Sequence, residues 1–192
     1  MAFAKISADA FKSMQFNAGM ILNTFDVESP PTTITDSTIV CATTGGISAE
    51  CTAEYQDLGE DVDNCPKNTK ELKRHDGWEC KFSFAALNVT PELIRLALGA
   101  ADVTAGAAGA ASTVTPRADL KAADFGTVYW LGDRIDGGWV LIKLSDALGT
   151  GGFSLQTEDN GKGQVSVELT GHVSINALDV VPMEFYVMEA AA

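Results

Sequence analysis

Apolar and polar residues alternate along several short stretches of this chain, as they do in strands that bury one face and expose the other to water. The longest stretch runs from Gln164 to Ile175, with apolar side chains at nearly every second position and Ser, Glu, Thr and His between them. Shorter stretches with the same period cover residues 47–56 and 78–86. The pattern predicts antiparallel strands that each have one polar and one apolar face.

Turn sequences join further strand-like runs into hairpins. Asp159-Asn160-Gly161 follows one run and Asp136-Gly137-Gly138 follows another, and Asn and Gly readily adopt the positive φ angles that tight hairpin turns require. The run after the second turn is apolar on both faces up to Lys143, so we expect both of its faces to be covered. Besides the alternating stretches, strands are predicted at 16–25, 127–131, 139–144, 152–158 and 183–189.

One α-helix is indicated by the residues at its two ends. Thr90 is suited to cap a helix N-terminus, Pro91 suits the first helical position, and Gly99 can end the helix. The Gly- and Ala-rich stretch that follows, 99–113, predicts a flexible surface loop. A second, weaker helical pattern spans residues 7–15.

These elements together predict a mainly β fold. About seven or more strands and one packed α-helix fit a β-sandwich or barrel with the helix against it. The length of 192 residues fits a single domain, 1–192, and the chain has no internal repeat. The segment between the strands at 47–56 and 78–86 is expected to form a long loop at about 57–76.

The composition argues against some classes of protein. The formal net charge is −13, whereas proteins that grip nucleic acid present a basic face to the phosphates. A surface of this charge repels a polyanion, so DNA could pass by it without adhering. No apolar run approaches the roughly 18 residues of a membrane span, so no membrane insertion is expected. The N-terminus lacks the apolar core of a signal peptide, which indicates a protein made and used in a cytoplasm.

The four cysteines, Cys41, Cys51, Cys65 and Cys80, include no closely spaced pair. Structural zinc sites usually use close ligand pairs, so a site that combined these cysteines with His75 is disfavoured. Without secretion we expect the cysteines to be reduced thiols. No metal and no cofactor is predicted.

The predicted loop at 57–76 changes sign along its length. Its acidic members come first and its basic members follow: Asp57, Glu60, Asp61, Asp63, Lys67, Lys70, Lys73 and Arg74. A calcium loop of the EF-hand type needs oxygen ligands at its first, third and fifth positions and Gly at the sixth. Counted from Asp61, the fifth position is Cys65 and the sixth is Pro66, so the pattern fails. A simple solvated loop, a looser divalent site and a contact arm for another copy of the chain remain alternatives.

Patterns of catalytic residues are missing as well. His75 and His172 are the only imidazoles, and no Ser or Cys has an evident base partner. The segments GFSLQ, GTGGFS and NGKGQ fail the nucleophile-elbow, dinucleotide and P-loop patterns. We therefore expect no enzyme and no catalytic residue. A divalent-dependent hydrolase that uses the carboxylates at 57–63 is the weakest alternative.

The polar faces of the alternating strands could line a water-filled channel. One copy has too few strands to enclose a wide channel, but several copies could do so with their strand edges paired, which would also remove exposed edges. The candidate lumen-facing residues are Glu50, Thr52, Glu54, Lys81, Ser83 and Glu168.

Three segments resemble the major tail tube protein of long, non-contractile-tailed bacteriophages. They run from Ala42 to Phe84, from Val114 to Ile175 and from Val181 to Glu189, and with the intervening chain they span most of residues 16–189. The elements that carry the resemblance are TGGIS, GEDVDN followed by KNTKELKR and DGW, and GTGGFSLQT. These elements are specific in combination, although none of them carries chemistry alone.

The resemblance implies a compact β-sandwich with a flanking helix and hexameric rings that stack into a tube around a tape measure protein. Inner-sheet strands of neighbouring subunits would join into one barrel, and a long loop would reach the next ring. The lumen would conduct viral DNA into the host without sequence-specific binding. Tail terminator and tail tip proteins are further implied partners, and the location is the virion tail, assembled in the bacterial host cytoplasm.

On this interpretation the charged residues of the 57–76 loop contact neighbouring subunits and rings, and their change of sign sets the polarity of stacking. The alternative is a monomeric β-sandwich that decorates a virion or acts as a binding module.

Overall fold

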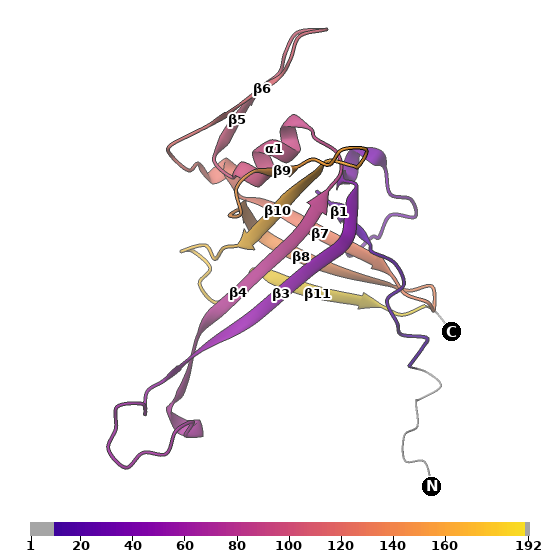
Figure 1. Ribbon diagram of the computed structural model, residues 1–192. Helices are drawn as coiled ribbons and strands as arrows, with labels where there is room; N and C mark the ends of the chain where they lie inside the picture. The colour runs from indigo at the N-terminus through magenta and orange to yellow at the C-terminus, as the bar shows by residue number, and fades with distance from the viewer. Residues whose placement is uncertain (1–9, 191–192) are drawn as a thin grey trace.

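The computed structural model describes residues 10–190, and within them the chain is mainly β with one α-helix, as expected (Figure 1). The strands are β1 Met20–Leu22, β2 Ile39–Cys41, β3 Thr43–Asp57, β4 Lys73–Ala86, β5 Ala101–Thr104, β6 Thr113–Pro116, β7 Gly126–Asp133, β8 Trp139–Gly149, β9 Ser154–Gln156, β10 Gln164–Gly171 and β11 Met183–Met188. The α-helix is α1, Pro91–Leu98, and short 3-10 turns are η1 Asp36–Thr38, η2 Lys70–Leu72 and η3 Ala122–Asp124.

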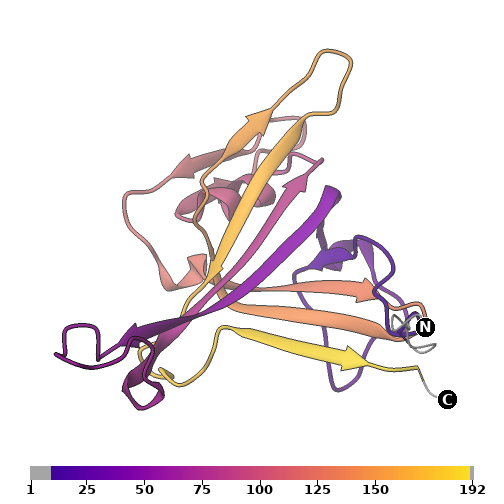
Figure 2. The same ribbon diagram turned by 60° about the horizontal axis from the view of Figure 1, so that its bottom comes forward.

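Nine of the strands form one antiparallel sheet in the order β2-β1-β7-β8-β10-β4-β3, with β9 beside β10 and β11 beside β8. The long strand β8 joins two halves of this sheet. Its residues 139–144 pair with β7 and β11, and its end, 147–149, pairs with β10. Figure 2 shows the half with β7, β8 and β11 diverging from the half with β3, β4 and β10. The apolar faces of the two halves are thus turned toward each other.

The main core fills the space between these halves. Phe82 of β4, Leu169 of β10 and Leu144 of β8 are fully buried there, and Leu93 and Ala97 of α1 pack against the same cluster. A smaller cluster lies on the opposite face of β7 and β8 and includes Leu22, Phe25, Leu131 and Leu141. The prediction that the strand at 139–144 is packed on both faces is therefore confirmed.

The ends of α1 are those that the sequence indicates. The Thr90 hydroxyl accepts a hydrogen bond from the Leu93 N–H at 3.2 Å, and Pro91 occupies the first turn, where its missing N–H costs nothing. Gly99 has a φ of 72° and donates its N–H to the carbonyl of Arg95. This left-handed backbone is the one that favours glycine, and it ends the helix.

The alternating run at 164–175 was predicted to be one strand, and its last third is not. Strand β10 ends at Gly171, which pairs with Ala147 of β8. Val173 and Ile175 are 44 % and 84 % exposed, so the prediction that they face the core with Val165 is wrong. They lie past the end of the β8–β10 ladder, and without a partner strand alternation alone does not hold a chain extended.

The stretch 99–113 is not simply a flexible loop. Residues 101–104 form β5, which pairs with β6 as a separate two-stranded hairpin, and the connection is limited to 105–112. Arg117 lies at the base of this hairpin and forms ion pairs with Asp102 and Asp124. Residues 105–111, all Gly or Ala, thus lie in the hairpin tip, whereas Gly99 ends α1 and Ala101 begins β5.

Other predicted elements also differ in extent from those of the structure, because only segments that pair with another strand become β-strands. Of the predicted helix at 7–15, residues 7–9 lie outside the described residues, and 10–13 form a turn. Gln15 makes an isolated bridge to Arg134 instead of continuing a helix. The strands expected at 16–25 and 152–158 shorten to Met20–Leu22 and Ser154–Gln156.

Candidate assembly surfaces

The six candidate lumen-facing residues lie on one face of β3, β4 and β10. Glu50 is directly opposite Lys81, and Ser83 is opposite Glu168. Residues that oppose each other across an antiparallel ladder share a face, and alternate residues along each strand do so as well. We call this surface, turned away from the main core, the polar face. Its members are Ser48, Glu50, Thr52, Glu54, Glu79, Lys81, Ser83, Ser166, Glu168 and Thr170.

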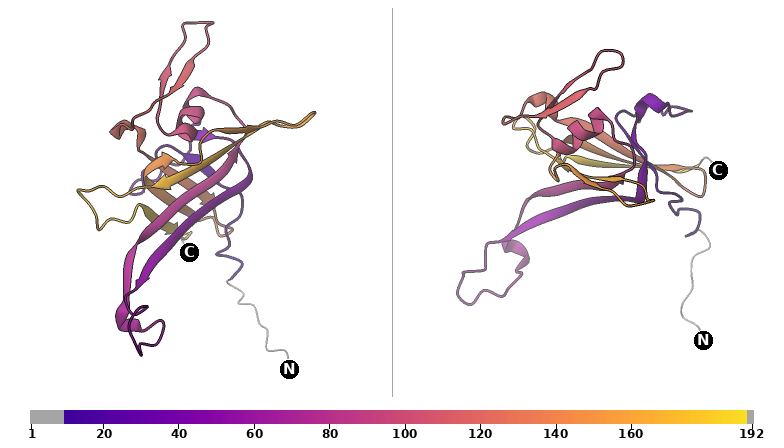
Figure 3. Two further views of the ribbon diagram at one scale, coloured as in Figure 1. Left: turned by 60° about the vertical axis from the view of Figure 1, so that its left-hand side comes forward. Right: turned by 45° about the horizontal axis from the view of Figure 1, so that its top comes forward.

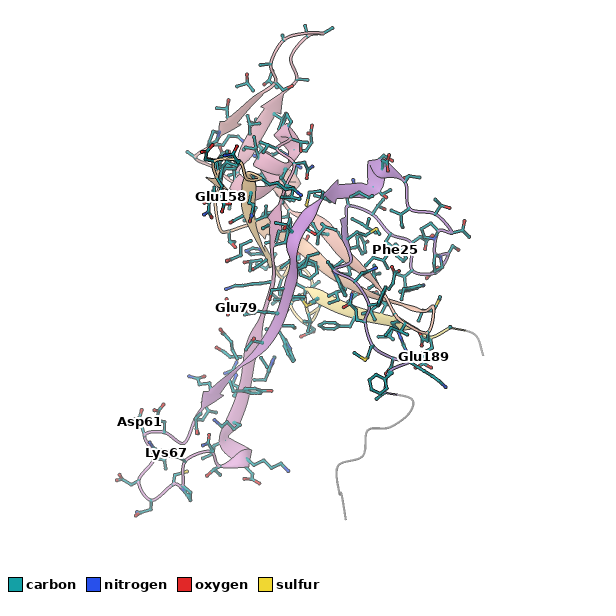
Figure 4. The ribbon with its side chains drawn as sticks, turned by 45° about the vertical axis from the view of Figure 1, so that its right-hand side comes forward. Phe25, Asp61, Lys67, Glu79, Glu158 and Glu189 are labelled. Carbon is teal, nitrogen blue, oxygen red and sulfur yellow. The ribbon has the colours of Figure 1, made fainter. Side chains whose placement is uncertain are left out.

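The polar face is acidic. Four carboxylates share it with the ammonium group of Lys81, which forms an ion pair with Glu79. The hydrogen bond with Glu79 raises the pKa of Lys81, and the charges of Glu79, Glu168 and Glu50 raise it further. Figure 4 shows Glu79 projecting from β4 away from β7, β8 and β11. Lys81 therefore stays charged and offsets only part of the negative charge.

Strand β3 offers a long edge beside this face. It has 15 residues and is the last strand of the sheet, and among residues 10–190 it pairs with β4 alone. A long edge with unpaired N–H and carbonyl groups is a template for another strand, and soluble proteins usually shorten or cover such edges. This edge is therefore a candidate site for pairing with another chain.

The ends of β3 and β4 extend beyond the body of the protein as a hairpin arm, which we define as residues 53–78 (Figures 1 and 3). The ladder continues to the pair Asp57↔Lys73, so the loop at its tip covers 58–72. The expected loop at 57–76 was therefore too long at its C-terminal side, where 73–76 are strand. The β5–β6 hairpin projects from the opposite end of the molecule, so the two ends carry different protrusions.

Asp57 organises the base of the tip loop. Its carboxylate accepts hydrogen bonds from the N–H groups of Gly59 at 3.1 Å and Asn68 at 3.2 Å, and it forms an ion pair with Lys73 at 3.5 Å. The bond from Gly59 contributes most to lowering the pKa of Asp57, and the contacts with Asn68 and Lys73 lower it further. Both Asp57 and Lys73 thus have a role inside the arm itself.

The other charged residues of the arm are exposed. Glu60, Asp61 and Asp63 lie on the half of the loop that follows β3, and Lys67, Lys70 and Arg74 lie on the half that leads into β4. The second half also carries Glu71 and Asp76, so it is mainly but not wholly basic, and Glu54 belongs to the polar face. Figure 4 shows Asp61 and Lys67 at the far end of the arm, away from the body. The tip therefore presents acidic and basic groups side by side to any neighbour.

Aromatic side chains on the arm were not singled out from the sequence. Tyr55 and Trp78 are 64 % and 42 % exposed. The imidazole of His75 lies between them, with ring centroids 5.6 Å from Tyr55 and 5.2 Å from Trp78. Tyr55 continues the apolar side of β3 past the end of the main core, so most of its side chain stays open to solvent. Only the lengths of the strands relative to the core reveal this exposure.

The carboxylates of the arm do not form a metal site. Among the described residues, no three His, Cys, Asp or Glu side chains lie close enough together to hold a metal ion. Of the four acidic residues in the hydrolase alternative, Asp57 is engaged by backbone N–H groups and Lys73. His172 lies against Phe125, with ring centroids 5.3 Å apart. The geometry therefore offers no support for a divalent-dependent hydrolase.

No helix within residues 10–190 is long and apolar enough to cross a membrane. No protein-family model matches the chain, and neither a curated protein nor a solved structure gives a significant match. The resemblance to phage tail tube proteins accordingly depends on the three sequence segments described above.

Proposed function

We propose that this protein is the structural subunit of a hollow tube, the major tail tube protein of a long, non-contractile-tailed bacteriophage. The observation that carries the proposal is the polar face, where an acidic surface spans three adjacent strands and the core packs against their opposite side. A sheet with this division can line a water-filled lumen on one side and pack protein on the other. The fold would be a β-sandwich whose inner sheet continues into the neighbouring subunits.

The number of strands that six copies would contribute supports a lumen wide enough for a DNA duplex. The inner sheet of one copy would consist of β9, β10, β4 and β3, with the edge of β3 available to a neighbour. If six copies each contributed four strands, about 24 strands spaced about 4.8 Å apart and tilted by about 40° would close into a cylinder about 48 Å across at the backbone. Such a bore admits a DNA duplex after side chains are allowed for.

The charge of the polar face suits a passage for DNA. A basic bore would release counterions from the phosphates and bind the duplex, and the strength of that binding would oppose its movement. Carboxylates at Glu50, Glu54 and Glu168 instead repel the duplex from the wall. The surface is therefore suited to transport without sequence-specific contact.

The hairpin arm would connect one ring to the next. It projects from one end of the molecule, and the β5–β6 hairpin projects from the other, so stacked copies present unlike surfaces to each other (Figure 3). Acidic and basic patches on the arm would guide register and orientation more than they add affinity. The tape measure protein would occupy the lumen before DNA, and the tail terminator and tip proteins would cap the stack.

Charge reversal on the basic half of the arm tests the stacking role. The variant Lys67→Glu, Lys70→Glu, Arg74→Glu spares Lys73, because Lys73 pairs with Asp57 inside the arm. Negative-stain electron microscopy of a tail fraction should show hollow tubes for the native protein and rings or monomers for the variant. The matched control Lys67→Arg, Lys70→Arg, Arg74→Lys keeps the charge and should form normal tubes.

Circular dichroism should show that the reversed variant keeps its strands, because all three side chains are exposed. Normal tubes from the charge-reversed variant would refute the stacking role of the arm. If the native protein remains monomeric in the tail fraction at high concentration and in any salt, the tube itself is refuted and the monomeric decoration module is favoured.

A further inference from the structure

Two cysteines that are 29 positions apart in the chain meet on the sheet. Cys51 of β3 is directly opposite Cys80 of β4, and their Sγ atoms are 3.0 Å apart. Opposed residues in antiparallel strands have Cα atoms about 4.5–5.5 Å apart, which lies within the range of about 4.4–6.8 Å that disulfides require. The backbone therefore needs no rearrangement for a bond between these two sulfur atoms.

The two thiols differ in their access to solvent. Cys80 is fully buried in the main core, whereas Cys51 is half-buried and packs at the edge of that core. Cys65 lies elsewhere, in the tip loop, where its thiol contacts Thr69 and the carbonyl of Pro66. Cys51 is thus the member of the pair that a small reagent can reach first.

We propose that Cys51 and Cys80 are a covalent modification site, which a low-molecular-weight disulfide of the glutathione class converts into a cross-strand disulfide. The Cys51 thiolate attacks one sulfur of the reagent, forms a mixed disulfide and releases one thiolate. The Cys80 thiolate then attacks the Cys51 Sγ and releases the second thiolate. The two cysteines lose two electrons and two protons, and the reagent is reduced to two thiols.

The environment of Cys80 controls the rate of the second step, in which its thiolate attacks the Cys51 Sγ. Burial raises the pKa of the Cys80 thiol to about 12, and its contact with Cys51 raises it as well. Only the thiolate attacks, so the exchange is slow near neutral pH and quickens as the pH rises. In a reducing compartment the pair remains as thiols, and outside it the disulfide accumulates.

The disulfide would link β3 to β4 at the base of the hairpin arm. The pair lies just before Ala53↔Trp78, where the arm begins, so a cross-link there holds the register of β3 against β4 along the whole projection. A shift of one residue in that register would turn the polar face inward. The inference stands on the cysteine geometry alone and does not depend on the tube proposal.

Peptide mapping of the folded protein tests the inference. The native protein is equilibrated in glutathione disulfide, quenched with acid, alkylated, and digested with a protease that cuts after glutamate. This digestion places every cysteine in a different peptide: residues 29–50, 51–54, 61–71 and 80–92. The expected product is peptide 51–54 joined to peptide 80–92, two hydrogen atoms lighter than the separate peptides, and an excess of reduced glutathione should release it.

Cys65→Ser should leave this product unchanged, and Cys51→Ser, at a half-buried position, should abolish it. Recovery of 51–54 and 80–92 as separately alkylated peptides, or a link from either of them to 29–50 or 61–71, would overturn the proposal. The native protein alone decides the question, so the test stands even if a cysteine variant folds poorly.

Discussion

Lysines on the polar face should turn a surface that repels DNA into one that binds it. The variant combines Thr52→Lys, Glu54→Lys and Glu168→Lys. The native face has four carboxylates and one ammonium, and the variant would have two carboxylates and four ammonium groups, so its charge changes from three negative to two positive per copy. Thr52 lies opposite Glu79, which gives one introduced lysine a carboxylate partner, and neither of the other positions lies opposite a lysine.

The salt dependence of binding gives the magnitude. Each ammonium that neutralises a phosphate contributes about 0.9 to the slope of log K against log salt, so the two introduced lysines that lack an opposing carboxylate, at positions 54 and 168, predict a slope of about −1.8. Between 50 and 200 mM salt the affinity should then fall about 12-fold. Lys81 adds little to this slope, because Glu79 already pairs with it.

Fluorescence anisotropy of a labelled duplex measures the effect on the unassembled subunit. The native protein should show no binding at 50 mM salt, and the variant should bind with the slope just given. The matched control is Glu28→Lys, Thr32→Lys, Asp179→Lys, which makes the same change in net charge at exposed positions outside the polar face. If the control binds as tightly as the variant, or if the native protein binds DNA itself, the argument from the charge of this face is wrong.

Three further outcomes are expected in urea titrations. Leu93→Ala truncates a side chain that is 1 % exposed and should lower the free energy of unfolding by about 2–5 kcal/mol. The control Leu58→Ala, in the exposed tip loop, should change the free energy of unfolding by less than about 0.5 kcal/mol. Equal effects of the two variants would contradict the core described above. Gly99→Ala should cost about 1–3 kcal/mol, because φ is 72° and the new Cβ would lie 2.7 Å from a carbonyl oxygen of β8, and a neutral result would contradict this helix end. The pKa of Asp124 is lowered by the hydrogen bond that its carboxylate accepts from the Lys121 N–H at the start of η3, and by Arg117. Its contribution to stability is therefore present above the ordinary pKa of an aspartate and is lost as the pH falls through the lowered value. Asp124→Asn should flatten the decline in stability between about pH 5 and pH 2, and an unchanged decline would count against that role.

Local patterns in the sequence were sufficient for the helix and for the composition of the two sheet faces. Thr90 and Gly99 determine the ends of α1 through one hydrogen bond and one backbone angle, both formed within a few residues. Alternation along β3, β4 and β10 was enough to group Glu50, Lys81 and Glu168 on one side, because the period of two is a property of each strand by itself. The lumen role of that side stays a prediction.

The tertiary structure alone decided which patterned segments became strands and which surfaces stayed open. Val173 and Ile175 alternate as well as Val165 does, but the edge of β8 that pairs with β10 at 147–149 pairs with β11 at 139–144, so this edge is not open to them and they are exposed. Tyr55 sits on the apolar side of β3 and is still exposed, because β3 and β4 are longer than the core they cover.

The contact between Cys51 and Cys80 likewise depends on the register between two strands joined by a 15-residue loop, 58–72. No pattern within either strand encodes it. Pairing partners, register and the extent of the core depend on contacts between residues far apart in the chain, whereas periodicity, helix capping and charge are properties of neighbours. For this reason the alternation could predict the polar face, and only the folded sheet could show the open edge of β3, the length of the arm and the meeting of the two thiols.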